Sequence, residues 1–407
     1  MTWSLNGHPL RAVLVSRLRY LGDIAMTTPV LEILRRGDPD LDIGYLCEAA
    51  YAPLLAGHPH LNRLHALVAH RSSSDAKIRR EDESLVQPKD TMSGIGEESS
   101  QKRNSGFTKG TWAMARELRR HRYDLCVDLF FNPRSAWLLR FSGSRWRIGG
   151  SQSWRRRLYT HTILPAKPEQ EPQFWTKTGG GLGDHLSRLT PLRHVESDLP
   201  FLGWLSTRAG EKQVHTHIAA PSLVGSLPER TLTGFGLDPA RGYILLAPGS
   251  TWPAKEWPVE HWSTLIDIIA RTASYPLVVL KPPLRTELYE KLAAAIPEGR
   301  GGVLPYLSLT DALRVVAAAS LLVCVDGGIM HAAVAMARPT LALFGPTAPE
   351  IWFPYEGRGP FRVLATKPHC HPCDRLECDD FVCLPDLGPE RVADAVYDLL
   401  GITAEAG

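Results

Sequence analysis

Asp23 is the first residue whose type and position could serve catalysis. It follows Gly22 at the end of a turn that leaves the apolar stretch Ala12–Ser16, so its carboxylate would project from the carboxyl end of a strand. A carboxylate placed there can take a proton from an incoming hydroxyl within hydrogen-bond distance. Asp is also a preferred N-cap residue of helices. The position alone leaves both interpretations open, a general base or a helix cap.

A second candidate group lies in the segment PGSTWPAKEWPVEHW, residues 248–262. Ser250 and Thr251 offer hydroxyls and Lys255 an ammonium group just after an apolar stretch, residues 243–247. Hydroxyls, loop amides and an ammonium group together suit a pyrophosphate. The alternative is a Pro-containing surface loop with a solvated lysine, as most lysines are.

The segment VDGGIMHAAVAMARP, residues 325–339, places Asp326, Gly327 and Gly328 between an apolar strand and a helix that opens near Met330. Small residues at such a junction let phosphates approach the helix N-terminus, whose free amides and dipole favour negative charge. Glycines can equally serve packing at a junction. His331 could bind a phosphate or a ribose, or be an ordinary residue of the first helical turn.

Two further clusters could bind ions. The array Cys-x2-Cys-x4-Cys-x4-Cys in CHPCDRLECDDFVC could hold zinc or an iron-sulfur cluster, but its spacing differs from the common zinc frameworks, so paired or free thiols remain the alternative. Its members are Cys370, Cys373, Cys378 and Cys383. A run of arginines could contact an anionic acceptor or a membrane surface, or form a solvated basic face. Its members are Arg145, Arg147, Arg155, Arg156 and Arg157.

Two series of alternating strands and helices would position these residues. In the first we expect strands at 12–16, 42–47, 61–68, 123–129 and 147–149 and helices at 24–34, 51–56, 111–120 and 135–141. In the second we expect strands at 243–247, 277–280, 321–325 and 340–344 and helices at 259–272, 286–295, 309–319 and 330–337. Continuous apolar strands between amphipathic helices predict parallel sheets covered on both faces. Ligands of such sheets bind at the carboxyl ends of the strands.

Two stretches interrupt these series. Residues 70–109 contain many Ser, Glu, Lys, Asp, Arg and Gly and few large apolar residues, so we expect a mobile insertion there. The stretch 151–228 is mixed, with a helix expected at 184–192 and the linker between domains near 221–228. We therefore expect one domain at residues 1–225 and a second at 226–407.

Composition limits the class of protein. A chain of 407 residues with 44% hydrophobic content can form two domains, and 46 basic against 43 acidic residues do not indicate nucleic-acid binding. The sequence has neither a run of 18 apolar residues nor a signal peptide, so we expect a cytoplasmic protein. Cys47, Cys126 and Cys324 lie in or beside apolar segments and are expected to be buried. No exposed apolar repeat stands out, so we expect a monomer.

Three blocks together resemble the lipopolysaccharide heptosyltransferase family, glycosyltransferase family 9. They are LVSRLRYLGDIAMTTPVLEILRR, PGSTWPAKEWPVEHW and VDGGIMHAAVAMARPTLALFGPT, in the same order and spacing as in the family. The stretch YDLCVDLFFNPRSAWLLRFSGSRWRIGG and the Cys-rich segment followed by LGPERVADAV are similar to the family as well. The likeness covers nearly the whole chain except residues 70–109.

The resemblance implies an α/β chain of GT-B fold, with two Rossmann-like domains whose parallel sheets face each other across a cleft. It also implies an inverting reaction without an essential metal or cofactor, from a nucleotide-activated heptose, usually ADP-heptose. The expected acceptor is a lipopolysaccharide core or a related anionic glycolipid at the inner membrane surface.

The resemblance also assigns roles to single residues. By position, Asp23 matches the family's general base. Ser250, Thr251 and Lys255 match its donor diphosphate contacts, and Lys255 would also stabilise the leaving group. The block that holds donor sugar and phosphates is matched by Asp326, Gly327, Gly328 and His331.

The sequence departs from the family at two places. The family commonly has Thr or Ser where Gly327 stands, so a hydroxyl contact to the donor is missing and the donor sugar could differ. The segment LKPPLRTELYEKL replaces a Gly-containing loop, and Glu287 is then the candidate acidic contact for the nucleoside. Two alternatives remain: transfer of another sugar to a different envelope glycan, and a non-catalytic protein that binds a nucleotide sugar. Intact Asp23 and Lys255 favour catalysis.

Overall fold

The computed structural model describes residues 3–5, 8–68, 109–150, 154–163, 216–281, 286–353 and 355–402. The expected helix at 184–192 and nearly all of the expected insertion at 70–109 lie outside the described residues. Lys109, which we had placed in the insertion, already begins a helix. The described residues form two α/β units, one before residue 164 and one after residue 226, and residues 216–226 before the second unit contain no helix or strand.

The first unit contains a six-stranded sheet of order β5-β4-β3-β6-β7-β8, in which every neighbouring pair is parallel. The strands are β3 (Ala12–Ser16), β4 (Asp42–Glu48), β5 (Arg63–Leu67), β6 (Leu125–Asp128), β7 (Trp146–Gly150) and β8 (His161–Ile163). The helices are α1 (Leu21–Gly37), α3 (Lys109–His121) and α4 (Pro133–Phe141), with 3-10 turns η1 (Ala49–Leu54) and η2 (Trp154–Leu158). A two-stranded hairpin, β1 (Ser4–Leu5) and β2 (His8–Pro9), precedes β3.

The second unit repeats this architecture with a six-stranded parallel sheet of order β11-β10-β9-β12-β13-β14. Its strands are β9 (Ile244–Ala247), β10 (Leu277–Val279), β11 (Gly301–Val303), β12 (Leu321–Val325), β13 (Thr340–Phe344) and β14 (Phe361–Ala365). Its helices are α7 (Leu227–Gly234), α8 (Val259–Thr272), α9 (Thr286–Ala295), α10 (Leu309–Ala318), α11 (Gly328–Ala335), α12 (Pro349–Trp352) and α13 (Pro389–Leu400), with 3-10 turns η3 (Pro239–Arg241) and η4 (Pro253–Lys255).

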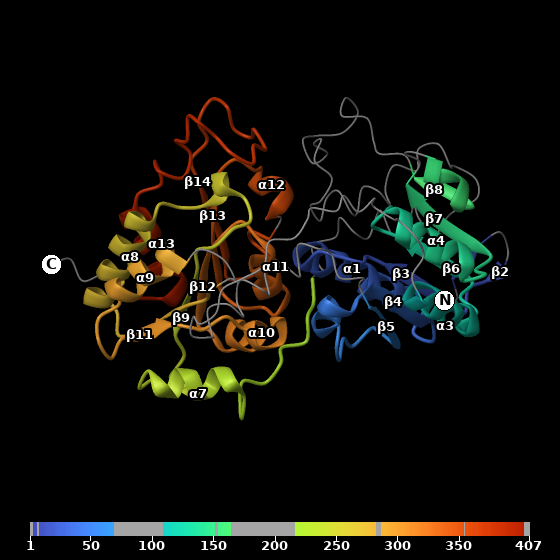
Figure 1. Cartoon of the computed structure of the whole chain (residues 1–407), viewed down its shortest axis with the longest axis horizontal. Helices are drawn as coiled ribbons and strands as arrows, with labels where there is room; N and C mark the ends of the chain where they lie inside the picture. Colours follow the sequence, from blue (N-terminus) through green and yellow to red (C-terminus); the bar gives the residue numbers. More distant parts are fainter. Residues whose placement is uncertain are drawn as a thin grey trace, which may run out of the picture.

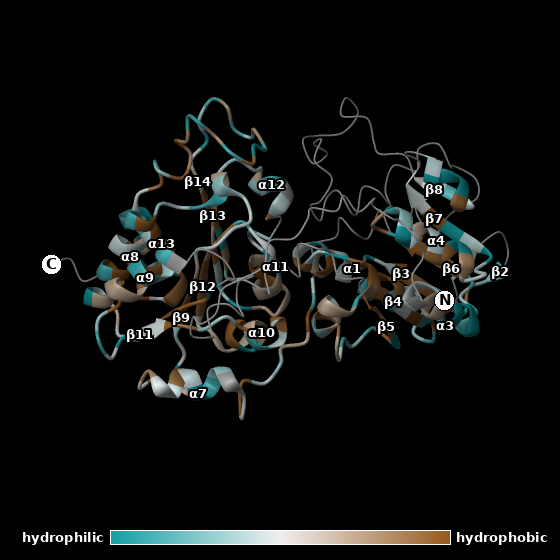
Figure 2. Cartoon of the chain, in the orientation of Figure 1, coloured by the Kyte–Doolittle hydropathy of each residue, from teal (hydrophilic) through white to brown (hydrophobic). Residues whose placement is uncertain are grey.

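The inner strands of both sheets are buried on both faces because helices cover each side. All residues of β3, β6, β9, β12 and β13 are buried, and Figure 2 shows these strands as the most hydrophobic part of each unit. The expected parallel α/β fold is therefore confirmed. The outer strands β8, β11 and β14 were not expected from the sequence, and the helix expected at 51–56 is the 3-10 turn η1.

The two units meet along helices α1 and α11, which lie side by side at the centre of the molecule (Figure 1). Backbone hydrogen bonds from residues 216–226 tie both units together: the His217 amide donates to the Thr28 hydroxyl at 2.8 Å, and the Ile218 amide donates to the Ala335 carbonyl at 2.9 Å. The carboxyl ends of β3 and β12 lead directly into α1 and α11, so the N-termini of these two helices face the same space.

Candidate active site

Asp23 lies in the first turn of α1, at its third helical position. One carboxylate oxygen accepts a hydrogen bond from the Tyr20 amide at 3.0 Å, and the other pairs with the buried Arg17 guanidinium at 2.8 Å. Tyr20 is the N-cap residue, so the interpretation of Asp23 as the N-cap itself is wrong, although Asp23 does satisfy a free amide of the helix start. The side chain of Asp23 is 14% exposed, so the carboxylate remains partly accessible.

Arg17 is fixed from two further sides. Its guanidinium donates to the Leu129 carbonyl at 2.7 Å and lies over the Phe130 ring, 4.8 Å from the centroid. Because the cation is locked by the carboxyl end of β6, it holds the Asp23 carboxylate in one orientation. Asp23 is thus a positioned anion at the carboxyl edge of the first sheet.

Lys255 and Asp326 form the second part of the site. The Lys255 ammonium lies 2.6 Å from Asp326 Oδ2, and the two side chains are 12% and 4% exposed. The Thr347 hydroxyl donates to the same carboxylate oxygen at 2.6 Å. The ammonium also lies over the Trp252 ring at 4.4 Å from its centroid. The structure therefore brings together two residues predicted from separate blocks, and it adds Thr347, which closes the third block.

The Cys-rich segment begins beside this ion pair. The amides of Cys373 and Asp374 both donate to the Pro346 carbonyl at 3.0 Å, and His371 Nε2 lies 3.1 Å from the Thr347 carbonyl. Burial raises the pKa of Asp374, an effect that the nearby Lys255 counteracts and Asp326 reinforces. The segment thus forms a wall of the Lys255 site, which its cysteine pattern did not predict. All four of its cysteines are free thiols, which agrees with the alternative of paired or free thiols.

His331 lies at the contact between the two units. It is 3% exposed, and its Nδ1 lies 2.8 Å from the Tyr355 hydroxyl. Burial lowers its pKa to about 4, although Asp326 and Asp23 act in the opposite direction. His331 is therefore a neutral side chain between the two candidate carboxylates, and its direct contact with a donor stays a prediction.

Gly327 and Gly328 play different parts. A Cβ on Gly328 would lie 3.0 Å from Leu21 Cδ2 and 3.1 Å from its Cβ, so the missing side chain lets α1 pack on α11. A Cβ on Gly327 would meet nothing closer than the Val325 carbonyl oxygen at 3.8 Å. Position 327 thus has room for a side chain and faces open space.

A pocket of about 270 Å³ opens at the carboxyl ends of β9, β10 and β12. Its lining is largely apolar and includes Leu280, Leu307 and Ile329, with Lys281 among its polar lining residues and Gly327 and Gly328 where α11 begins. The volume is close to the lower end of the range of about 300 to 1,000 Å³ that small-molecule pockets usually show. An apolar slot that ends at a helix N-terminus suits a nucleoside joined to phosphates.

The remaining donor candidates Ser250, Thr251 and Glu287 are not among the described residues that line this pocket. Ser250 is half-buried, and its hydroxyl accepts a hydrogen bond from the Trp252 amide at 3.1 Å, while Thr251 is exposed. Glu287 is exposed in the first turn of α9. The roles of these three residues stay predictions.

The arginine run divides in the structure. Arg147 donates to the carbonyls of Leu158 and Ser144 at 2.9 and 2.6 Å, and burial lowers its pKa, so it has a structural role. Arg145 is exposed and lies over Trp146. Arg156 and Arg157 are exposed on η2, whereas Arg155 is half-buried with a buried Nε. The run is therefore not one continuous basic face.

Arg19 and Arg134 are candidates that the sequence analysis missed. Both lie at the carboxyl edge of the first sheet, where Arg134 pairs with Glu48 at 3.7 Å and donates to the Val68 carbonyl at 2.9 Å. Burial lowers the pKa of Arg134, Glu48 counteracts this, and the neighbouring Arg19 lowers it further. The sequence did contain a signal for both residues, since Arg19 lies inside the first block and Arg134 lies in the NPR sequence with which α4 begins.

Two parallel-sheet units that meet at their strand ends, with a pocket in one and a positioned carboxylate in the other, have the architecture of a GT-B glycosyltransferase. The sequence model of glycosyltransferase family 9 (heptosyltransferase) matches residues 214–379. The chain is 26% identical to lipopolysaccharide heptosyltransferase 1 of Pseudomonas aeruginosa over 95% of its own length and 98% of that protein. It is 24% identical to lipopolysaccharide heptosyltransferase 3 of Escherichia coli, over 86% and 90% of the two chains. The chain is thus similar to the heptosyltransferases of family 9 over nearly its whole length, and it is a glycosyltransferase.

Solved structures agree on the fold. The family 9 glycosyl transferase of Veillonella parvula superimposes with a TM-score of 0.67 at 19% identity, over 96% of this chain and 97% of that one. The ADP-heptose lipopolysaccharide heptosyltransferase II of E. coli superimposes with a TM-score of 0.65 at 20% identity, over 96% and 98%. No helix among the described residues is long and apolar enough to cross a membrane.

Proposed function

We propose that this protein transfers a heptose from ADP-heptose to a lipopolysaccharide core or related anionic glycolipid, with inversion at the anomeric carbon. The observation that supports the proposal is the packing of the α1 N-terminus on the α11 N-terminus, where His331 lies close enough to experience the charges of Asp23, Asp326 and Lys255. The relative heptosyltransferase WaaC of E. coli, of the same fold with a TM-score of 0.57, has been solved with ADP-2-deoxy-2-fluoro heptose, which supports this donor.

In this proposal the donor occupies the second unit. The nucleoside lies in the apolar pocket, and its diphosphate lies at the N-terminus of α11, where Gly327 exposes the first helical amides. Lys255, Ser250 and Thr251 follow β9 at the same edge of the sheet. Asp326 holds the ammonium in place through a 2.6 Å contact, so the cation need not reorganise when charge develops on the leaving group.

The acceptor hydroxyl then attacks the anomeric carbon from the face opposite the diphosphate. A new carbon–oxygen bond forms, the bond to the β-phosphate oxygen breaks, and ADP leaves with the bonding electrons. Asp23 takes the hydroxyl proton, because its carboxylate lies at the carboxyl edge of the first sheet and is held in one orientation by Arg17. The charge on ADP is stabilised by Lys255 and the α11 N-terminus, so no step in this proposal is routed through a metal.

The acceptor would bind to the first unit. Arg19 and Arg134 lie near each other at the edge that carries Asp23, and the Arg19 Nε is buried without a hydrogen-bond partner among the described residues. Two adjacent guanidinium groups favour a phosphate or carboxylate between them. Arg145 in the turn before β7 and Arg156 and Arg157 on η2 are exposed and would add positive charge toward a membrane surface that carries the lipid.

The open space at Gly327 supports a second candidate, a donor sugar other than the usual heptose. A hydroxyl side chain would fit there, because the nearest atom to a Cβ is 3.8 Å away, yet none is present. We expect Gly327→Ser to change the preference among donor sugars without a loss of stability. Unchanged donor preference in that variant would remove this candidate.

Calorimetric titration of ADP-heptose, with UDP-sugars and GDP-sugars as controls, into the wild type and Lys255→Ala tests the proposal. We expect selective binding of ADP-heptose that weakens in the variant. Selective binding of another nucleotide sugar would establish transfer of a different sugar. Failure to bind any donor, in a protein that is folded, would overturn the proposed donor and favour a non-catalytic role.

A further inference from the structure

We propose that His65, Glu117 and His121 bind a divalent transition metal, with Zn²⁺ as the ion that suits this set of groups. Their ligand atoms all lie within 4.8 Å of one another. Among the described residues this is the one set of three or more His, Cys, Asp and Glu side chains that is close enough to share an ion. Two imidazoles and one carboxylate are a ligand set that zinc accepts readily, with a fourth position left for water.

Two elements supply the ligands. His65 lies in the middle of the edge strand β5, and Glu117 and His121 lie four residues apart on α3, so they project from one face of the helix. His65 is 2% exposed, and its Nδ1 lies 2.5 Å from Glu117 Oε1. The ring centroids of His65 and His121 are 5.1 Å apart. To bind an ion between these groups, only the ends of the Glu117 and His121 side chains would have to move.

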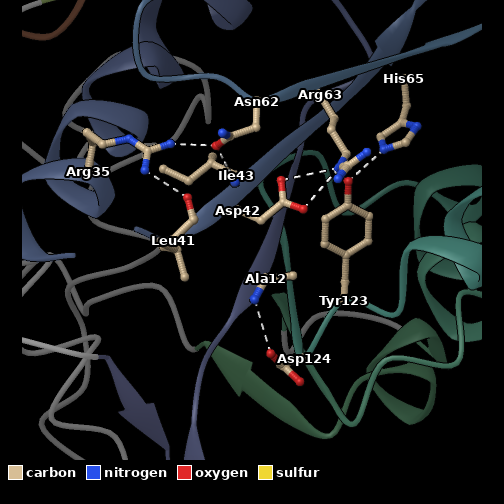
Figure 3. Close-up of polar contacts among 10 residues, drawn as sticks. All are labelled: Ala12, Arg35, Leu41, Asp42, Ile43, Asn62, Arg63, His65, Tyr123 and Asp124. Atoms are coloured by element: carbon tan, nitrogen blue, oxygen red, sulfur yellow. Dashed lines mark hydrogen bonds and ion pairs between the residues drawn. The ribbon is translucent and has the colours of Figure 1, made fainter. Parts of the chain in front are cut away.

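The other nitrogen of His65 is held by a tyrosine, as metal-binding histidines require. Its Nε2 lies 2.7 Å from the Tyr123 hydroxyl, and Figure 3 shows the phenol pointing at the His65 ring beside Arg63 and Asp42. Gly44 makes this possible, because a side chain there would collide with the Tyr123 ring. When Nε2 donates to the tyrosine, the lone pair of Nδ1 faces Glu117 and His121.

The position of the site indicates a structural role. His65 and Glu117 are 52 residues apart in the sequence, and β5 and α3 are the elements on either side of residues 69–108. An ion held by both elements would link two segments that are far apart in the sequence and so stabilise the edge of the sheet. Helix α3 lies on the side of the first unit that is farther from α11 (Figure 1), so the ion would not take part in sugar transfer.

Titration of the metal-free, untagged full chain with Co²⁺, followed by competition with Zn²⁺, tests the site. We expect one Co²⁺ with the visible bands of nitrogen and oxygen ligation and without thiolate charge-transfer bands. His121→Ala should weaken binding at least about tenfold, and Tyr123→Phe by about 10- to 100-fold, because it removes the group that orients His65. Zn²⁺ should raise the melting temperature of the wild type and not that of His121→Ala.

Two variants serve as controls. His161→Ala removes a histidine from β8 of the same unit, and Cys373→Ser/Cys378→Ser removes two thiols of the Cys-rich segment; both should bind Co²⁺ at the site as the wild type does. Glu117→Gln is the second ligand variant, since its side chain is 45% exposed and its loss should leave the fold intact. The proposal is overturned if the wild type binds neither ion, if both ligand variants bind normally, or if binding is lost in the cysteine variant.

Discussion

At the scale of single residues, the pairing of Lys255 with Asp326 both lowers the cost of burying the ammonium group and fixes its position. A lone ammonium with only 12% exposure would be costly, and Asp326 offsets this cost at 2.6 Å. The Thr347 hydroxyl donates a hydrogen bond to the same carboxylate oxygen, so two groups stabilise the charge of Asp326. The pair therefore presents a fixed cation, whose charge a diphosphate can share without displacing the lysine.

Lys255→Ala should lower kcat by about 100- to 1,000-fold, the usual effect of removing one group that stabilises developing negative charge. The variant should also be less stable, because it leaves a buried carboxylate without its cation. Steady-state kinetics and urea unfolding measure the two effects. Lys291→Ala, which removes an exposed lysine of α9, should change neither.

Adding Asp326→Asn to Lys255→Ala separates the two roles. The double variant carries no unpaired carboxylate, so its stability should recover toward the wild type while its turnover stays low. Recovery of turnover together with stability would mean that Lys255 acts only through the fold.

Asp23→Asn should lower kcat by about 100- to 10,000-fold, the range for loss of a general base. The amide oxygen can still accept the hydrogen bond from the Tyr20 amide, so helix α1 should remain intact. Donor affinity, measured by calorimetry, should change little. Glu229→Gln is the matched control, because Glu229 occupies the same helical position in α7 and accepts from the Gly225 amide. A loss of turnover in both variants, or in neither, would contradict the assignment of Asp23.

The sequence was sufficient to predict that Asp23, Lys255 and Asp326 follow buried strands of parallel sheets, and their roles stay predictions. It could not name Tyr355, which contacts His331 from a segment 24 residues away, because such contacts depend on three-dimensional packing. Asp374 was hidden for the same reason. The Cys-rich segment drew attention to its thiols, whereas its backbone is what reaches the site.

At the scale of elements, the close packing of α1 on α11 depends on glycines from both helices. A Cβ on Gly22 would lie 2.6 Å from His331 Cδ2 and 3.4 Å from the Gly328 Cα. His331 cannot easily move, since it is buried and held by Tyr355. The glycines therefore let two helix N-termini approach each other, which concentrates positive potential where a diphosphate would lie.

Gly22→Ala should destabilise the protein by about 1 to 3 kcal/mol, as overpacking of a tight contact usually does. Helix propensity alone predicts the opposite sign, because Ala is better than Gly in a helix by about 1 kcal/mol. The free energy of unfolding, measured with urea, decides between these two predictions. We also expect turnover to fall, because the N-termini of α1 and α11 would move apart. The control is Gly234→Ala at the end of α7, where a Cβ meets nothing within 4 Å. Equal effects of the two substitutions would show that the α1 contact is loose.

The elements themselves followed from the sequence where the pattern was strong. The strands β12 and β13 and helix α8 were predicted residue by residue, because continuous apolar or amphipathic runs leave little choice. Strand β11 consists of Gly301, Gly302 and Val303 and β14 is only half-buried, so neither has a run of buried apolar side chains. Such edge strands form because a neighbouring strand offers hydrogen bonds. The hydrophobic pattern of the segment itself therefore does not predict them.

At the scale of the whole molecule, each unit contributes a buried histidine at or near the junction between the two units. His331 lies where α11 meets α1, and His58 packs against His217 with ring centroids 5.2 Å apart. Burial lowers the pKa of His58 to about 3 and that of His331 to about 4. Both groups are neutral when the units are docked and would take up protons more readily once exposed. Acid should therefore act on the docking of the two units.

Stability should fall as the pH is lowered from about 6.5 to about 4. The unfolded chain binds a proton at His331 below pH 6.5, whereas the folded chain does not bind it until about pH 4, so unfolding takes up protons in this window. His331 alone contributes on the order of 3 kcal/mol to the loss, at about 1.4 kcal/mol per pH unit. Urea unfolding at a series of pH values measures this slope. His331→Leu/Tyr355→Phe removes both hydrogen-bonding partners and should flatten part of it, while the exposed His369→Ala should follow the wild type. A double variant as steep as the wild type would show that other groups, and not the histidine between the two units, cause the sensitivity to acid.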